Sequence, residues 1–133
     1  MLRCIIIDDS SVIRTVGSRI ITSLGDLNVL EAPTWRSGYD ICADNMPEIV
    51  IIDGDLPDGA GIDLLEELSS IDHRNKASLL LMLAEVDLSA VMRAKRAGAA
   101  GYLLKPFDRS TMLEVVAPLV EARKAQAFAA RAA

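Results

Sequence analysis

Short apolar runs alternate with segments of helical periodicity along the chain, and this alternation limits the possible folds more than any other feature. The first run covers residues 2–7 and is followed by two acids, as expected of a strand buried on both faces. From Ser10 onward the apolar residues recur at helical spacing, with Ser10 or Ser11 as candidate N-caps and Gly25 as the stop. The chain therefore begins with a strand followed by a helix.

The same order repeats along the rest of the chain. Further strands are predicted at residues 27–31, 48–52, 78–83 and 100–104. Further helices are predicted at residues 35–43, 62–68, 87–97 and from 108 or 110 onward. Residues 54–61 and 72–76 are predicted to be connections, and Pro118 is expected to kink or restart the last helix.

Strands joined through helices run parallel, because a parallel crossover needs a long connection that is usually a helix. The expected architecture is a single α/β domain of (βα)5 type, with a doubly wound, five-stranded parallel sheet and helices on both faces. The 133 residues have room for one such domain, which we assign to residues 1–121. Residues 122–133 are rich in alanine and are expected to extend the last helix as a tail that frays.

Charge and hydropathy argue against several classes of function. The net charge is −5, and no cluster of Lys or Arg provides the basic face that nucleic-acid binding requires. No segment approaches the ~20 apolar residues of a membrane span, and the first apolar run is too short for a signal peptide. We therefore expect a cytoplasmic protein without membrane insertion, in which Cys4 and Cys42 are buried free thiols.

Charged residues gather where the predicted strands end. Asp8 and Asp9 follow the first strand, and Asp53 follows the third. Lys105 follows the fifth. In open parallel sheets, ligands bind beyond the carboxyl ends of the strands, so these side chains should converge on one edge. Clustered carboxylates raise one another's pKa unless a cation neutralises them, and Mg²⁺ prefers such oxygen ligands.

Each of these residues has a simpler interpretation when it is taken alone. An acid after a strand often caps the next helix, and a single lysine is usually a solvated surface charge. Capping does not explain why three separate strand ends deliver acids and a lysine together. The combination predicts a functional site that holds a divalent cation.

Three motifs occupy these strand ends. They are, in chain order, Asp8-Asp9-Ser10, then Asp53 followed by Leu56-Pro57 and Gly61, then Gly101-Tyr102-Leu103-Leu104-Lys105-Pro106-Phe107. Together they resemble the signatures of response regulator receiver domains, in particular the chemotaxis CheY-like type. The likeness extends from about Leu2 to the last helix, and it implies a flavodoxin-like sheet with the strand order 2-1-3-4-5.

The resemblance implies a phosphoacceptor and a metal site. Asp53 would receive a phosphoryl group from a sensor histidine kinase or a histidine phosphotransfer protein, as part of a two-component phosphorelay. Mg²⁺ would be held by Asp9, Asp53 and the backbone carbonyl of Asp55, and Asp8 would act mainly through a coordinated water. Lys105 would pair with the phosphoryl oxygens. Such a transfer depends mainly on positioning and charge neutralisation, which the metal and the lysine would supply.

The resemblance also assigns parts of the backbone and of the surface. The Lys105–Pro106 bond is expected to be cis. Backbone N–H groups of Gly54 and Ala84 would be further donors to the phosphoryl group. The fourth helix, the fifth strand and the fifth helix would form the face that binds a downstream protein. The chain would signal through this contact and would catalyse only its own phosphorylation and dephosphorylation.

One position departs from the receiver pattern. Receivers normally have Thr or Ser at the end of the fourth strand, where its hydroxyl bonds the phosphoryl group and couples to an aromatic residue on the fifth strand. Here the two positions are Leu83 and Tyr102. A hydrogen bond to a charged group contributes about 1.5–3 kcal/mol, which leucine cannot supply. The metal site, the nucleophile and Lys105 do not depend on that hydroxyl, but the usual conformational response does.

Two alternatives follow from these residues. Because of Leu83, the chain is also interpreted as a receiver-fold adaptor that binds its partner independently of phosphorylation. Asp53-Gly54-Asp55 also fits the Asp-x-Asp motif of aspartate-dependent phosphatases, but those enzymes place the motif on the first strand of a larger chain. The extra charge of Asp55 is expected either to face solvent or to position an attacking water.

Overall fold

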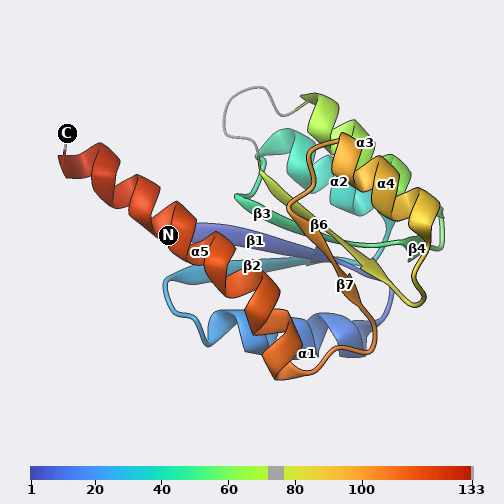
Figure 1. Ribbon diagram of the computed structural model, residues 1–133, viewed down its shortest axis with the longest axis horizontal. Helices are drawn as coiled ribbons and strands as arrows, with labels where there is room; N and C mark the ends of the chain where they lie inside the picture. Colours follow the sequence, from blue (N-terminus) through green and yellow to red (C-terminus); the bar gives the residue numbers. More distant parts are fainter. Residues whose placement is uncertain (72–76, 133) are drawn as a thin grey trace.

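The computed structural model describes residues 1–71 and 77–132 and contains a five-stranded parallel sheet (Figure 1). Its strands are β1 (Leu2–Ile7), β2 (Leu27–Ala32), β3 (Ile49–Asp53), β6 (Ser78–Leu83) and β7 (Gly101–Leu104). Their order across the sheet is β2-β1-β3-β6-β7, and every neighbouring pair is parallel. When only these five strands are counted, this is the predicted order 2-1-3-4-5. The predicted connection at residues 72–76 lies outside the described residues.

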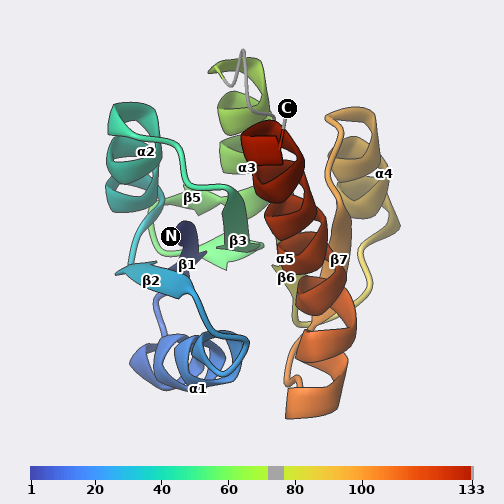
Figure 2. The same cartoon turned by 90° about the vertical axis from the view of Figure 1, so that its left-hand side faces the viewer.

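Helices cover both faces of the sheet, as the alternating pattern predicts. One face carries α1 (Ser11–Thr22) and α5 (Arg109–Ala132), which contact each other (Figures 1 and 2). The other face carries α2 (Trp35–Asp44), α3 (Gly61–Ile71) and α4 (Leu88–Arg96), packed in that order. Among the described residues, none of these helices combines the length and the apolar character that crossing a bilayer requires.

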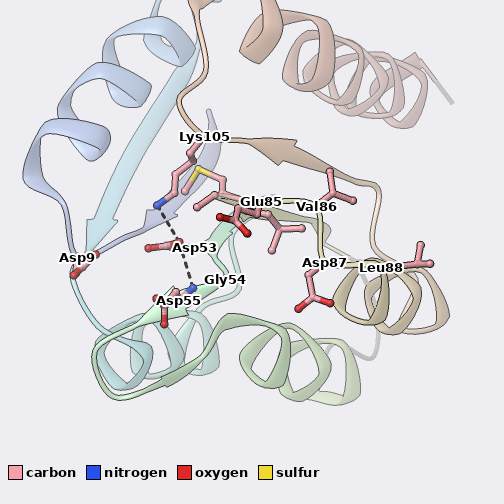
Figure 3. Close-up of a pocket in the computed structure, with 12 residues that line it drawn as sticks. Asp9, Asp53, Gly54, Asp55, Glu85, Val86, Asp87, Leu88 and Lys105 are labelled. Carbon is pink, nitrogen blue, oxygen red and sulfur yellow. Dashed lines mark hydrogen bonds and ion pairs between the residues drawn. The ribbon is translucent and has the colours of Figure 1, made fainter.

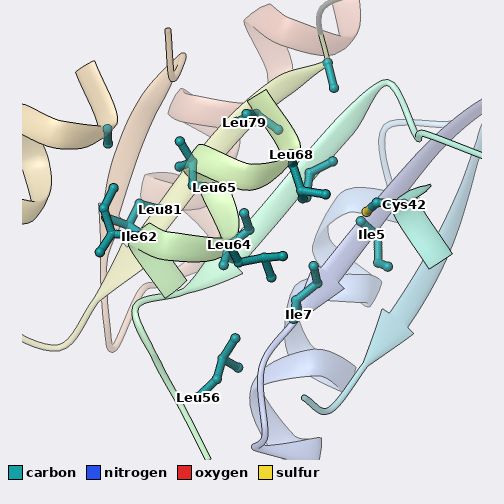
Figure 4. Close-up of a cluster of buried hydrophobic side chains, with 14 of the residues drawn as sticks. Ile5, Ile7, Cys42, Leu56, Ile62, Leu64, Leu65, Leu68, Leu79 and Leu81 are labelled. Atoms are coloured by element: carbon teal, nitrogen blue, oxygen red, sulfur yellow. The ribbon is translucent and has the colours of Figure 1, made fainter. Parts of the chain in front are cut away.

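The strands are buried on both sides, so successive side chains enter two different cores. Ile5 and Ile7 belong to the core beneath α2, α3 and α4, which is drawn in Figure 4. Cys4 and Ile6 belong to the core beneath α1 and α5. This two-sided burial is the reason that the strands appear in the sequence as continuous apolar runs.

Local capping signals mark where helices begin and end, as expected. The Ser10 hydroxyl accepts a hydrogen bond from the Ile13 N–H at 3.2 Å, and the Asp87 carboxylate accepts one from the Ala90 N–H at 3.2 Å. Gly25 has a φ of +76°, in the left-handed region that terminates many helices. Ser10 and Asp87 lie in strand-to-helix turns at one edge of the sheet, and Gly25 lies in a helix-to-strand turn at the other.

Two parts of the chain differ from the sequence predictions. Residues 54–61, predicted as a plain loop, contain a small antiparallel hairpin formed by β4 (Asp55–Leu56) and β5 (Gly59–Ala60). The last helix also passes through Pro118 without a break, so of the predicted kink or restart, the restart is wrong. Core contacts of Met112, Val116 and Val120 hold α5 on both sides of the proline, whose side chain is exposed.

Candidate functional site

The functional residues lie at the carboxyl edge of the sheet, where three strands end together. Asp8 directly follows β1, Asp53 is the last residue of β3, and Lys105 directly follows β7. The strand register explains why they meet: Ile7 pairs with Ile52, so the residues after them are level across the sheet. Residues almost one hundred positions apart in the sequence thereby become neighbours.

Three carboxylates form a compact oxygen cluster at this edge. One carboxylate oxygen from each of Asp8, Asp9 and Asp53 lies within 4.8 Å of the other two. Asp8 is 0% exposed and Asp53 is 3% exposed, whereas Asp9 is exposed to solvent. Buried carboxylates so close together need a cation, and an oxygen-only donor set of this kind suits a hard divalent ion.

Lys105 is the cation that the protein itself provides. Its Nζ lies 3.1 Å from Asp8 Oδ2 and 3.0 Å from Asp53 Oδ1, so one ammonium group bridges two buried acids. Burial alone would lower the pKa of Lys105, but the hydrogen bonds to Asp53 and Asp8 outweigh it and raise the pKa. The lysine is therefore charged at neutral pH. The Lys105–Pro106 peptide that precedes α5 is cis, which confirms the prediction.

Asp53 is the carboxylate of the site whose negative charge is least favoured by its surroundings. Burial raises its pKa above the ordinary value, and the charge of Asp8 adds to this, while the hydrogen bond from Lys105 offsets part of the effect. The single positive charge of Lys105 does not balance the negative charges of the three carboxylates. A further cation would relieve this repulsion.

A cleft of about 820 Å³ opens above Asp53 (Figure 3). Acidic side chains and one lysine provide its charged lining, namely Asp9, Asp53, Asp55, Glu85, Asp87 and Lys105. Figure 3 shows Asp53 between Lys105 and Gly54, with Asp9 and Asp55 on one side of it and Glu85 on the other. Asp53 is thus buried on its strand yet reachable from solvent through this cleft.

The backbone around Asp53 is closely packed. A Cβ placed on Gly61 would lie 2.0 Å from the Asp53 carbonyl oxygen, so only glycine fits there. The Gly54 N–H donates to the Met82 carbonyl at 2.7 Å. The Gly54 N–H, expected to be a donor to a phosphoryl group, is thus bonded to β6 in this structure. Ala84, the second predicted backbone donor, lines the cleft.

Arg14 also supports the site, although it was not among the predicted site residues. Its Nη1 donates to the Asp8 carbonyl at 2.7 Å, and its Nε lies 3.1 Å from Glu31 Oε1 at the end of β2. The arginine thus fixes the turn that carries Asp8 and Asp9. A signal was present, since a basic residue near a helix N-terminus opposes the helix dipole and needs a local reason.

Of the two positions of the expected switch, Leu83 has no hydroxyl. Leu83 is 8% exposed and lines the cleft with an apolar side chain. Tyr102 is 43% exposed on β7, where it borders a hollow of about 310 Å³ beside Val91 and Ala94 of α4. In this structure, nothing polar in the Leu83 side chain can connect the cleft to Tyr102.

The family model that describes the response regulator receiver domain matches residues 4–117, which is most of the chain. The chain belongs to the response regulator receiver family. Members of this family are signalling proteins and not conventional enzymes.

Known proteins similar to this receiver agree with the family model. A chemotaxis protein CheY from Thermotoga maritima is 31% identical over 114 residues, which cover 86% of this chain and 93% of that protein. Chemotaxis protein CheY-3 from Vibrio cholerae is 27% identical and covers 90% of this chain and 92% of the relative. A CheY-like receiver domain protein from Methanospirillum hungatei has a structure with a TM-score of 0.82, at 26% identity, covering 93% and 98% of the two chains.

Proposed function

We propose that this receiver accepts a phosphoryl group on Asp53 in a Mg²⁺-dependent reaction and signals by binding another protein. The observation that carries the proposal is the position of Asp53. Its carboxylate is at the floor of an open cleft, 3.0 Å from the Lys105 ammonium and beside two further acids. Phosphoryl transfer needs a positioned nucleophile and nearby positive charge, and this arrangement offers both.

The donor set fits a magnesium ion. Asp9 and Asp53 would contribute carboxylate oxygens, the backbone of Asp55 a carbonyl oxygen, and Asp8 would act through a coordinated water. Mg²⁺ usually takes only one or two protein carboxylates and leaves its other positions to water and phosphate, which agrees with an exposed Asp9 facing the cleft. Bound there, the ion would neutralise charge on the transferring phosphoryl group.

The residues of the chain carry the remaining steps. A carboxylate oxygen of Asp53 attacks the phosphorus of a phosphohistidine, the new P–O bond forms as the P–N bond breaks, and the donor imidazole leaves and takes up a proton. Lys105 already bonds the Asp53 carboxylate, so it is placed to hold phosphoryl oxygens after the transfer. The Ala84 N–H at the cleft wall would be a further donor.

The proposed donor is a sensor histidine kinase or a histidine phosphotransfer protein, and the proposed target binds the face of α4, β7 and α5. On that face Arg93 is already engaged, because its guanidinium lies 2.7 Å from Asp63 Oδ1 and 2.5 Å from Glu66 Oε1 of α3. Lys95 and Arg96 of α4 are exposed, which leaves them available to a partner.

Labelling with a small phosphodonor tests the proposal. We expect acetyl phosphate to add one phosphoryl group to the wild-type chain when Mg²⁺ is present and none when it is chelated, as measured by intact mass. The Asp53→Asn variant should remain unlabelled, whereas the control Asp55→Asn, which keeps the backbone carbonyl, should still be labelled. Label that persists in Asp53→Asn, or that forms equally without Mg²⁺, would contradict the proposal.

Leu83 supports a second candidate, a receiver-fold adaptor whose partner binding ignores phosphorylation. A leucine that lines the cleft cannot follow the phosphoryl group as a hydroxyl would. Partner affinity measured with and without the phosphoryl mimic beryllofluoride separates the two functions. Equal affinity in both states would favour the adaptor, and a clear difference would favour the switch.

A further inference from the structure

The last helix extends well beyond the receiver core. The family match ends at residue 117, but α5 continues to Ala132, and Figure 1 shows this end projecting past the N-terminus and away from the sheet. Lys124 Nζ lies 3.4 Å from the Leu24 carbonyl, which fixes the base of the projecting part to the body. Beyond this contact, Phe128 is 74% exposed.

The projecting helix and the body enclose a groove of about 730 Å³. Met1 and Phe128 are apolar and line it, although they are 88% and 74% exposed. The groove lies at the amino edge of the sheet, since Leu2 begins β1 and Glu48 precedes β3. It is therefore at the opposite end of the strands from Asp53.

The two walls of the groove carry opposite charges. The body contributes Asp26 and Glu48, and the helix contributes Lys124 and Arg131. Within residues 1–71 and 77–132, no ion pair joins either base to either acid. A partner of one charge sign would be attracted by one wall and repelled by the other. A surface with both signs on separate walls instead complements itself after a two-fold rotation.

We propose that this groove is a self-association surface whose occupant is a second copy of the chain. In the pair, the projecting helix of each copy lies in the groove of the other, and Phe128 of each copy is buried against the apolar lining of the other groove. Arg131 faces Glu48 of the partner subunit, and Glu48 faces Arg131 of the partner subunit. Because the Asp53 cleft is at the other edge of the sheet, pairing leaves it accessible, and this inference does not rest on the proposed phosphorylation.

Sedimentation velocity of the full chain over a range of concentrations tests this surface. We expect the wild-type chain to shift from monomer to dimer as its concentration rises, and to dissociate more readily at high salt because the ion pairs are exposed. Phe128→Ala should weaken association by at least about tenfold, as removal of a central aromatic anchor does. Val12→Ala is the matched control, because Val12 is 68% exposed on α1 and does not line the groove.

Charge reversal gives a second test that does not depend on the loss of an apolar side chain. Arg131→Glu should weaken association, and adding Glu48→Arg to the same chain should restore it, because both copies then carry the reversed pair. A wild-type chain that remains a monomer at every concentration would overturn the proposal. So would a Phe128→Ala chain, folded by circular dichroism, that associates as the wild type does.

Discussion

Asp53 is buried beside another carboxylate, and this burial has a cost for stability. Because the folded state raises its pKa, the protonated form is favoured in the fold. The stability linked to Asp53 is therefore fully present below the unfolded pKa of about 3.9 and is lost as the pH rises through the folded pKa. At neutral pH the charged side chain destabilises the metal-free protein.

We expect Asp53→Asn to raise the free energy of unfolding of the metal-free protein by ~1 kcal/mol at pH 7, with little effect below pH ~4. Chemical denaturation at the two pH values measures this. Saturating Mg²⁺ provides the control, since an ion that binds the folded wild type should stabilise it more than the variant. A variant less stable than the wild type at pH 7 without metal would contradict this reading of the site.

Leu83 is the second residue whose role can be measured directly. Leu83→Thr supplies a hydroxyl at the cleft, and we expect a larger conformational response to beryllofluoride, measured by hydrogen exchange in β7 and α4. The loss of buried apolar volume should cost about 2 kcal/mol of unfolding free energy. Leu83→Val matches the size of threonine without the hydroxyl, so an equal response in both variants would rule out the hydroxyl as the cause.

The convergence of Asp8, Asp53 and Lys105 was predictable from the sequence, because the carboxyl ends of parallel strands meet at one edge. Individual hydrogen bonds were not. The bond from the Gly54 N–H to Met82 and the bond from Arg14 to the Asp8 carbonyl depend on side-chain and loop positions that no periodicity encodes. Sequence patterns thus located the site but not its supporting contacts.

At the scale of elements, the hairpin after Asp53 is tied to the start of α2. The Asp58 carboxylate accepts hydrogen bonds from the Trp35 N–H at 2.8 Å and the Arg36 N–H at 3.0 Å, and so caps the helix from outside it. The Trp35 indole packs over Gly59, where a Cβ would lie 2.9 Å from the ring. The loop that carries Asp55 is therefore coupled to α2.

Trp35 is the only tryptophan, so its fluorescence reports this coupling. We expect Asp58→Ala to lower the melting temperature and to shift the emission to longer wavelength, because two hydrogen bonds to the start of α2 are lost and the indole becomes more exposed. Asp58→Asn, which keeps one carbonyl acceptor, should have a smaller effect on both. Unchanged emission in Asp58→Ala would show that the hairpin does not hold Trp35 in place.

The last helix gives a further prediction at this scale. Pro118 cannot donate a hydrogen bond to the carbonyl four residues earlier, yet core contacts keep α5 continuous. We expect Pro118→Ala to raise the free energy of unfolding by about 2 kcal/mol, since alanine restores the bond and has high helix propensity. Glu121→Ala on the same exposed helix surface is the control. A destabilised Pro118→Ala protein would contradict this.

The periodicity of apolar residues predicted the long strands and helices, but not the β4–β5 hairpin or the continuity of α5 through Pro118. Six-residue apolar runs and helical spacing are strong signals, and the strands and helices formed close to their predicted bounds. The β4–β5 hairpin has only two residues in each strand, too few to show alternation. Continuity through Pro118 depends on tertiary packing, which local propensity does not contain.

At the scale of the whole molecule, each core contains one cysteine. Cys4, on β1, belongs to the core beneath α1 and α5, and Cys42, on α2, points into the core on the other face of the sheet. Burial raises the pKa of each thiol to about 12. Both thiols should therefore be almost inert to thiol reagents in the folded protein.

If the two cores unfold together, both cysteines should become reactive in a single transition with increasing urea, as measured by mass spectrometry of the labelled peptides. The raised pKa values also give a pH dependence, because the fold favours the neutral thiols. The free energy of unfolding should keep its full value below the ordinary thiol pKa of about 8.5 and decline as the pH rises toward 12. Cys4→Ala and Cys42→Ala each leave one reporter for assignment. Separate transitions for the two thiols would show that the cores unfold independently.

The molecule as a whole places its proposed chemistry at one edge of the sheet, where five acids and a lysine surround a single cleft. The decisive question is which carboxylate receives the phosphoryl group. Borohydride reduces an aspartyl phosphate to homoserine, so peptide sequencing after reduction identifies the residue. We predict homoserine at position 53 alone, and only when Mg²⁺ is present during phosphorylation. Homoserine at position 8, 9 or 55, or at no position, would contradict the assignment of Asp53 as the phosphoacceptor.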